Sequence, residues 1–136
     1  MSSAEGPPAP DGPVGIDHVQ LAAPPGCEAQ AHAFYGGLLG LREVEKPEPL
    51  RAGGGVWFEL GANQLHIGVA DPFTPARQAH PALRMADEAA LEAMAVRLQA
   101  AGAHVSWDTR LSAVRRFFAD DPWGNRLELL VTPGRR

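Results

Sequence analysis

The chain repeats a set of residues at a fixed offset of 62 positions, and this repeat limits the folds that it can adopt. His18 and His80 lie 62 positions apart (80 − 18), and so do His66 and Glu128 (128 − 66). Within each half the two residues are 48 positions apart (66 − 18 and 128 − 80). The same offset pairs Leu21 with Leu83, Ala31 with Ala93, Gly40 with Gly102, Asn63 with Asn125 and Leu65 with Leu127. The pattern predicts a duplicated module in which four side chains of metal-ligand type occupy two pairs of equivalent positions.

The composition predicts a globular protein and argues against several functional classes. The 136 residues are enough for one compact domain and too few for two, and 45% of them are hydrophobic. The formal charge is −4, and the chain has neither a basic stripe for nucleic acid nor an apolar run long enough to span a membrane. The start of the chain lacks a secretory signal pattern, and the single Cys27 cannot form an intrachain disulfide. We therefore expect a cytoplasmic protein with no nucleic-acid or membrane partner.

Each half of the chain has the pattern of a β-α-β-β-β unit. Residues 1–13, with four prolines and two glycines, are expected to form a disordered tail, and 14–133 a single domain. The domain is divided into module one (14–70), a linker (71–79) and module two (80–133). Strands are expected at 16–22, 41–45, 56–60 and 64–69 and again at 81–85, 104–107, 115–119 and 126–131. Helices are expected from an apolar stripe at Ala31, Phe34, Tyr35 and Leu38, ended by Gly40, and over 88–101, capped by Asp87 and ended by Gly102.

Alternation within the strands predicts that all candidate ligands share one face of the sheet. Successive side chains of a strand point to opposite faces. The aliphatic residues of the first and last strands of each module share one parity, and this face needs a helix to cover it. The opposite, polar face holds one candidate ligand per strand with one polar neighbour: His18 with Gln20, His66 with Gln64, His80 with Arg84, and Glu128 with Arg126.

Five segments carry a resemblance to a known family: IDHVQLAAP, FYGGLLGL, QLHIGV, HPALRMAD and FFADDPWGNRLELL. They resemble the vicinal oxygen chelate superfamily, which includes glyoxalase I, bleomycin resistance proteins and extradiol dioxygenases. The last segment is the most specific, and the resemblance covers residues 14–133. It implies an α+β, glyoxalase-like fold of two βαβββ modules, whose curled mixed sheets form a metal-binding cleft.

The resemblance also implies a metal site on the first and last strand of each module, at His18, His66, His80 and Glu128. Three imidazoles and one carboxylate suit Zn, Ni or Fe, and also Mn or Co, better than Mg or Ca. Four hydrogen-bonded polar side chains without a metal are the alternative, but the shared spacing and parity favour the divalent metal. Glyoxalase I enzymes usually have Glu where this chain has His66, so Glu128 is the only expected carboxylate ligand and the expected catalytic residue.

Four further residues are expected to bind substrate in the cleft. Arg84 and Arg126 share the ligand face and can pair with a carboxylate or phosphate, or lie at the cleft rim as solvated cations. Trp57 is a candidate pocket wall or a packing residue, and Gln20 lies beside His18 on the polar face. Arg115 and Arg116 alternate, so only one of them can point inward, and the sequence does not decide which.

The favoured function is that of a metal-dependent enzyme of the glyoxalase or dioxygenase type, a lyase, isomerase or dioxygenase. It would act on a small oxygenated substrate chelated at the metal, with a homodimer as the expected assembly and ligands drawn from one or both subunits. The alternatives are a non-catalytic drug- or metabolite-binding protein, of the bleomycin resistance type, and a regulatory member with an empty site.

Overall fold

The computed structural model describes residue 6 and residues 11–132. Most of the expected N-terminal tail, 1–5 and 7–10, lies outside the described residues. The strands of the first half are β1 (His18–Ala23), β2 (Glu43–Val44), β3 (Val56–Leu60) and β4 (Asn63–Val69). Those of the second half are β5 (Ala82–Arg84), β6 (Val105–Asp108), β7 (Arg115–Asp120) and β8 (Arg126–Val131). The helical segments are α1 (Glu28–Ala31), η1 (His32–Leu38), η2 (Glu48–Gly53) and α2 (Glu88–Ala100).

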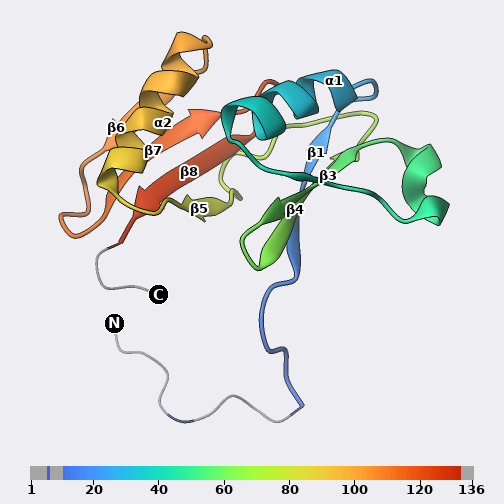
Figure 1. The fold of residues 1–136 in the computed structure, drawn as a ribbon, viewed down its shortest axis with the longest axis horizontal. Helices are drawn as coiled ribbons and strands as arrows, with labels where there is room; N and C mark the ends of the chain where they lie inside the picture. Colours follow the sequence, from blue (N-terminus) through green and yellow to red (C-terminus); the bar gives the residue numbers. More distant parts are fainter. Residues whose placement is uncertain (1–5, 7–10, 133–136) are drawn as a thin grey trace.

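The strands form two four-stranded sheets with the same topology, so the fold is α+β with two β-α-β-β-β modules (Figure 1). The orders are β1-β4-β3-β2 and β5-β8-β7-β6. In each sheet the first strand runs parallel to the last, and the other neighbours are antiparallel. The parallel pair needs a crossover, which the helix of each module provides. The duplication predicted from the sequence is therefore present in the strand order.

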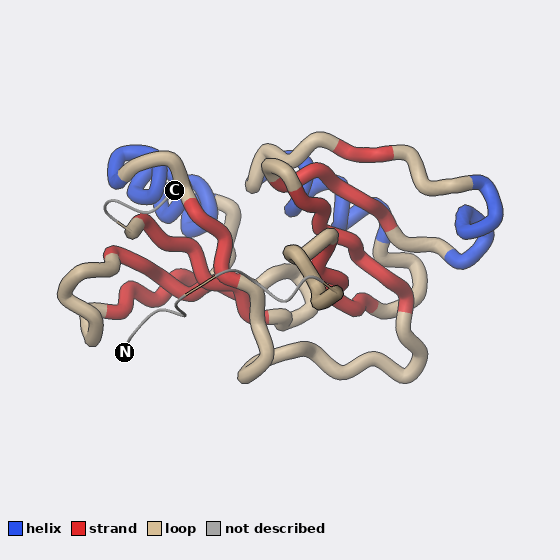
Figure 2. The backbone as a smooth tube through the Cα atoms, turned by 90° about the horizontal axis from the view of Figure 1, so that it is seen from below, coloured by secondary structure: helices blue, strands red, loops and turns tan. Residues whose placement is uncertain are grey.

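The helices α1, η1 and α2 lie on one side of the two sheets, and among the described residues no helix covers the other side (Figures 1 and 2). The core lies between the helices and the sheets, where the aliphatic side chains of the predicted face are buried. The largest fully buried side chains on the two modules are Tyr35, Phe58, Leu65, Ile67, Leu91, Leu98, Phe117, Leu127 and Leu129. Alternation thus predicted the buried face, with the exception of Val69 at the end of β4, which is exposed.

The first helix differs in kind from the expected one. After one α-helical turn the segment His32–Leu38 is a π-helix, in which the Leu39 N–H donates to the Phe34 carbonyl, five residues back, at 2.9 Å. The apolar stripe did not reveal this widening, because Phe34 and Tyr35 are buried in either geometry. Gly40 adopts a φ of 79° and ends the helix as expected, since a left-handed residue favours glycine.

The second half matches the expected helix cap and differs elsewhere only at element ends. The Asp87 side chain accepts a hydrogen bond from the Ala90 N–H at 2.8 Å and caps α2. In the first half, the segment between the expected strands at 41–45 and 56–60 contains the 3-10 helix η2. The fifth strand is shorter than expected, because Pro81 has no N–H to donate and the ladder begins at Ala82.

A buried polar cluster joins the two modules on the helix side. The Tyr35 hydroxyl donates to Asp121 Oδ2 at 2.8 Å, and Asn125 Nδ2 donates to the same oxygen at 2.8 Å. Asn125 also donates to the Ala22 carbonyl on β1 and accepts from the Ala76 N–H, each at 2.8 Å. Asn125 and Tyr35 are fully buried. The Asp-Pro-x-Gly-Asn turn is therefore an intermodule contact, and burial next to a carboxylate raises the pKa of Tyr35 well above its usual value.

Within the described part of the chain, no helix is long and apolar enough to cross a bilayer.

Candidate metal centre

The strand register places the four candidate ligands at equivalent positions of the two sheets. In module one Gln20 of β1 pairs with His66 of β4, which pairs with Trp57 of β3. In module two Ala82 of β5 pairs with Glu128 of β8, which pairs with Phe118 of β7. Cross-strand neighbours of this kind project from the same face of a sheet. Trp57 and Phe118 are thus structural equivalents, although the 62-residue offset does not pair them.

The two histidines of module one form a stacked pair. The rings of His18 and His66 lie 4.2 Å apart between centroids at 18°, and Trp57 stacks on the other side of His66 at 3.8 Å and 2°. This sandwich leaves His66 only 3% exposed, although it lies on the polar face. Burial, and then the proximity of His18, lower the pKa of His66, so its ring is held in the neutral form that binds metals.

Polar neighbours fix the orientation of both rings. Asp17 Oδ1 lies 2.9 Å from His18 Nδ1. This contact uses Nδ1 and does not involve the other ring nitrogen, Nε2. Gln64 Oε1 lies 2.8 Å from His66 Nε2. An amide oxygen accepts, so this nitrogen donates in the present state, and Gln64 must turn away before His66 can bind a cation through Nε2.

The second pair, His80 and Glu128, is arranged differently. His80 Nδ1 lies 2.9 Å from the carbonyl oxygen of Gln78, which can only accept, so Nδ1 carries the proton. On the other side of the ring, His80 Nε2 faces Glu128 Oε1 at 3.1 Å. Two electron-rich atoms at this distance require a second proton or a metal cation between them. A backbone carbonyl that fixes Nδ1–H is the usual way in which a metal-binding histidine is oriented.

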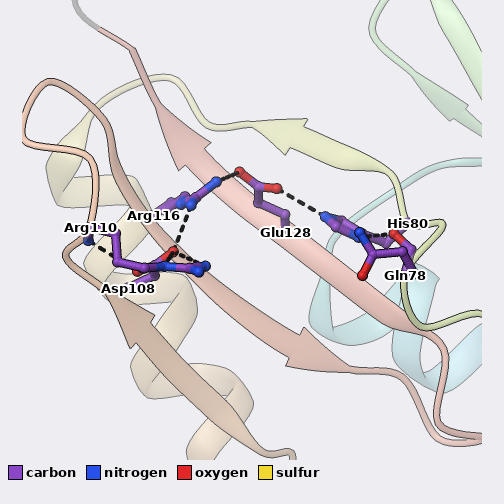
Figure 3. A network of polar contacts seen from close by, with 6 residues as sticks. All are labelled: Gln78, His80, Asp108, Arg110, Arg116 and Glu128. Atoms are coloured by element: carbon purple, nitrogen blue, oxygen red, sulfur yellow. Dashed lines mark hydrogen bonds and ion pairs between the residues drawn. The ribbon is translucent and has the colours of Figure 1, made fainter.

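Glu128 is held on its other oxygen by an arginine (Figure 3). Arg116 Nη1 donates to Glu128 Oε2 at 2.9 Å, and Arg116 Nη2 donates to Asp108 Oδ2 at 2.6 Å. Asp108 also accepts from Arg110, and these hydrogen bonds hold the pKa of Asp108 well below its usual range. Figure 3 shows the resulting row of alternating charges, which crosses module two from β6 to the start of β5.

The row identifies two residues that the sequence did not assign to the site. Phe117 of β7 is buried against the helix side of the sheet. Since neighbouring side chains of a strand point to opposite faces, Arg116 points to the ligand face and Arg115 does not. Arg115 lies on the opposite face, over the Trp107 ring at 4.2 Å and 3.1 Å from Glu92. The sequence could not decide between them, because Phe117 and Phe118 are both aromatic and either of them could have been the buried residue. Asp108 gave no signal, because its expected strand ended one residue earlier.

The single chain brings the expected ligands together as two pairs. Among residues 6 and 11–132, no group of three His, Cys, Asp or Glu side chains converges in a way that could hold an ion. His18 and His66 face out from one sheet, and His80 and Glu128 from the other. A four-ligand centre therefore requires that the polar face of module one meets the polar face of a module two.

The expected substrate-binding residues lie on the same faces. Gln20 is exposed and lies across Gly68, where a Cβ would come within 2.7 Å of its amide nitrogen. Arg126 is half-buried with its guanidinium 5.4 Å from the Phe118 ring centre, and Arg84 is exposed. Neither arginine has a carboxylate partner within the described residues. A groove of ≈ 520 Å³ lies between β1 and β5 and is lined in part by Gln20, Gln64 and His80.

The donor set fits a divalent transition metal. Two donor atoms bonded to one ion at about 2.1 Å and at right angles lie about 3.0 Å apart. His80 Nε2 and Glu128 Oε1 have this separation, at 3.1 Å. Neutral imidazoles and one carboxylate are the ligands that Zn, Ni, Fe, Co and Mn accept.

Comparison with known proteins identifies the family. The model of the Glyoxalase/Bleomycin resistance protein/Dioxygenase superfamily matches residues 15–129, and the chain belongs to this superfamily. This membership confirms the resemblance found in the sequence. A search of curated proteins finds no match.

Solved structures support the same fold. A glyoxalase family protein from Bacillus anthracis is 42% identical, with a TM-score of 0.85 over 91% of this chain and 99% of that chain. Lactoylglutathione lyase from Agrobacterium tumefaciens is 23% identical, with a TM-score of 0.68 over 88% and 94%. The fosfomycin resistance protein FosX from Listeria monocytogenes is 16% identical, with a TM-score of 0.72 over 89% and 95%. The last two comparisons show a shared fold.

Proposed function

We propose that this chain is a metal-dependent enzyme of the glyoxalase type, which acts on a small oxygenated substrate as a homodimer. The observation that carries the proposal is the pair His80 and Glu128. Their facing atoms lie 3.1 Å apart, and the proton of His80 is already committed to the Gln78 carbonyl. The pair is therefore prepared to accept a cation.

In this proposal His18 and His66 of one subunit complete the centre with His80 and Glu128 of a second subunit. The argument is geometric, since each pair lies on an open sheet face and the described part of one chain holds no larger group. A two-fold dimer that packs these faces together would make two equivalent sites. The same arrangement would cover His18, whose side chain is 43% exposed here.

The residues around the pairs have separable roles in the proposal. A bound divalent ion, Zn, Ni, Fe, Mn or Co, supplies Lewis acidity that polarises adjacent oxygens of a substrate. Arg126 and Arg84 attract an anionic substrate group, because both present charge on the cleft face without a partner in the described chain. Trp57 forms a wall beside His66, and Gln20 lines the groove. Glu128 is the carboxylate nearest the proposed reaction centre.

The proposal is tested by metal analysis and titration of the chain purified without chelator. We expect one ion per subunit, dimers in solution, and a rise in melting temperature when Zn, Ni, Co, Fe or Mn is added, since a ligand that binds only the folded state stabilises it. Glu59→Gln is the matched control for Glu128→Gln, because Glu59 lies on the same side of module one but is paired with Arg42. A chain that binds none of these ions would contradict the proposal.

A drug- or metabolite-binding protein without a metal is the second candidate function. One observation favours it, namely that Gln64 engages His66 Nε2 and the stacked rings of Trp57, His66 and His18 form an aromatic surface. Such a surface suits a planar ligand. The metal titration separates the two functions, because this candidate predicts no ion and no stabilisation by one.

A further inference from the structure

We infer that Arg116 is a positioning residue that orients Glu128 to bind a metal through one oxygen. We also infer that Asp108 balances the positive charge of Arg116, so that Arg116 can hold Glu128 beside a cation. This inference depends on the proposed metal site. It concerns residues that the ligand pattern does not include.

The geometry divides the Glu128 carboxylate between two partners. Oε2 accepts from Arg116 Nη1 at 2.9 Å, and Oε1 faces His80 Nε2 at 3.1 Å. The hydrogen bond from Arg116 occupies one lone pair of Oε2 and fixes the rotation of the carboxylate. This rotation turns Oε1 towards His80, so Oε1 is the oxygen that an ion beside His80 would meet first.

Arg116 is itself fixed from the other side. Its Nη2 donates to Asp108 Oδ2 at 2.6 Å, and its side chain is 15% exposed. The Phe118 ring lies 5.2 Å from the guanidinium carbon. Arg116 Nε is buried and has no partner among the described residues. The side chain thus gives up one hydrogen bond and remains in the single orientation that reaches both carboxylates.

The negative charge of Asp108 offsets the positive charge that Arg116 brings to the proposed metal site. A lone arginine next to a divalent cation would weaken metal binding by repulsion. Arg110, Asp108, Arg116 and Glu128 carry alternating charges, so the row sums to zero before the ion binds (Figure 3). Arg116 can therefore orient Glu128 without adding net positive charge to the site.

A charge-balanced double variant tests the inference. Removal of Arg116 alone changes both orientation and charge, and the two changes act in opposite directions on a cation. Asp108→Asn combined with Arg116→Gln leaves the summed charge as it was. It removes the ionic hydrogen bonds by which Arg116 joins Glu128 to Asp108, which we call the clamp, together with the surface pair between Arg110 and Asp108. The matched control is Glu92→Gln combined with Arg115→Gln, which removes an ion pair of the same type from the same strand on the opposite face.

The measurements are the affinity for Co²⁺ and Zn²⁺ alone and the visible absorption spectrum of bound Co²⁺, which depends on its coordination. We expect the clamp variant to bind about 10- to 100-fold more weakly, the range for loss of an orienting partner. Its Co²⁺ spectrum should change, while the control should match the wild-type chain in both. Arg116→Lys keeps the charge but cannot span both carboxylates, so we expect a loss of about tenfold.

The outcomes separate this inference from the proposed function. A wild-type chain that binds no metal overturns both. A wild-type chain that binds metal, with equal affinity and spectrum in the clamp variant, overturns the role of Arg116 alone. Equal losses in the clamp and control variants would show a general effect on folding and also overturn it. If the clamp variant does not fold, Arg116→Lys decides, and wild-type affinity in it contradicts the inference.

Discussion

The two modules hold their equivalent candidate ligands by different physical means. In module one, aromatic stacking and burial keep His66 in place and neutral, between Trp57 and His18. In module two, a row of ionic hydrogen bonds holds the Glu128 side chain in place. Equivalent strand positions of the two modules therefore lie in different electrostatic environments. The environment in module one suits neutral donors, and the environment in module two suits the one carboxylate. A duplicated backbone fixes where a ligand lies, and its neighbours decide which ligand can be there.

The largest difference between the modules is expected at their β-hairpins, where the repeat places Asn63 and Asn125. Asn125 is fully buried, and its side chain makes three hydrogen bonds, to Ala22 of module one, Ala76 of the linker and Asp121 of its own turn. Asn125→Ala should therefore lower the free energy of unfolding by about 4 kcal/mol, because each orphaned partner costs about 1–3 kcal/mol. Asn63 is exposed and donates to the Ile16 carbonyl, so Asn63→Ala should change the free energy of unfolding by less than about 0.5 kcal/mol. Urea denaturation measures both, and equal effects would show that the buried cluster does not join the modules.

An exchange of ligands between the modules should not restore the site. The double variant His66→Glu with Glu128→His keeps three imidazoles and one carboxylate, but it puts the carboxylate beside Trp57 and leaves Arg116 without Glu128. We expect metal affinity to fall by about 100-fold, or about 2.7 kcal/mol. Titration with Zn²⁺ measures it. Wild-type affinity in this variant would show that the two environments are interchangeable.

The neutral state of His66 should make stability depend on pH. Its pKa is lowered in the folded chain, so the unfolded chain takes up a proton first as the pH falls. The contribution of His66 is therefore complete above pH about 6.5, the ordinary value, and is lost as the pH falls below it. Trp57→Ala should raise the pKa of His66 towards its ordinary value by exposing the ring, and Phe118→Ala, the equivalent change in module two, should leave it unchanged. Titration of the ring by NMR measures this pKa, and the opposite ranking of the two variants would contradict the account.

The smallest effect is expected at Glu59, a carboxylate of β3 that shares the strand parity of Trp57. Glu59 is paired with Arg42 on the surface, at side-chain exposures of 44% and 78%. Exposed ion pairs of this kind contribute little, so Glu59→Gln should leave the urea midpoint and the metal affinity unchanged. Glu128→Gln in parallel should abolish metal binding. A comparable loss in Glu59→Gln would show that module one supplies a carboxylate to the site.

Much of the fold could be predicted from the sequence, because local patterns determined it. The offset of 62 residues predicted the duplicated topology, and the alternation in β4 and β8 predicted that Leu65 and Leu127 are buried. The π-helical widening at His32–Leu38 could not be predicted, since an apolar stripe is compatible with both helix types. The lengths of the short strands β2 and β5 depend on where ladder partners end, and this is a tertiary property.

The positions of the four candidate ligands in the fold could be predicted from the sequence, and their contacts could not. The positions of His18, His66, His80 and Glu128 on the polar faces followed from parity. The stack on His66 depends on which β3 residue pairs with it across the hairpin, and the five-residue turn of module two breaks the sequence offset there. The Arg116 clamp joins three strands of one sheet, and no local pattern encodes a contact between residues 108, 116 and 128.

The central claim is that module one of one chain and module two of another share each metal. Its most direct test mixes two inactive chains, His18→Ala with His66→Ala and His80→Ala with Glu128→Gln, and measures bound Zn²⁺ after the subunits exchange. Each chain alone should bind none. The mixture should bind about one ion per four chains, since half of randomly paired two-fold dimers are mixed and each of these has one intact site. A mixture that binds no more than its separate components, beside a wild-type chain that binds one ion per subunit, would contradict the claim.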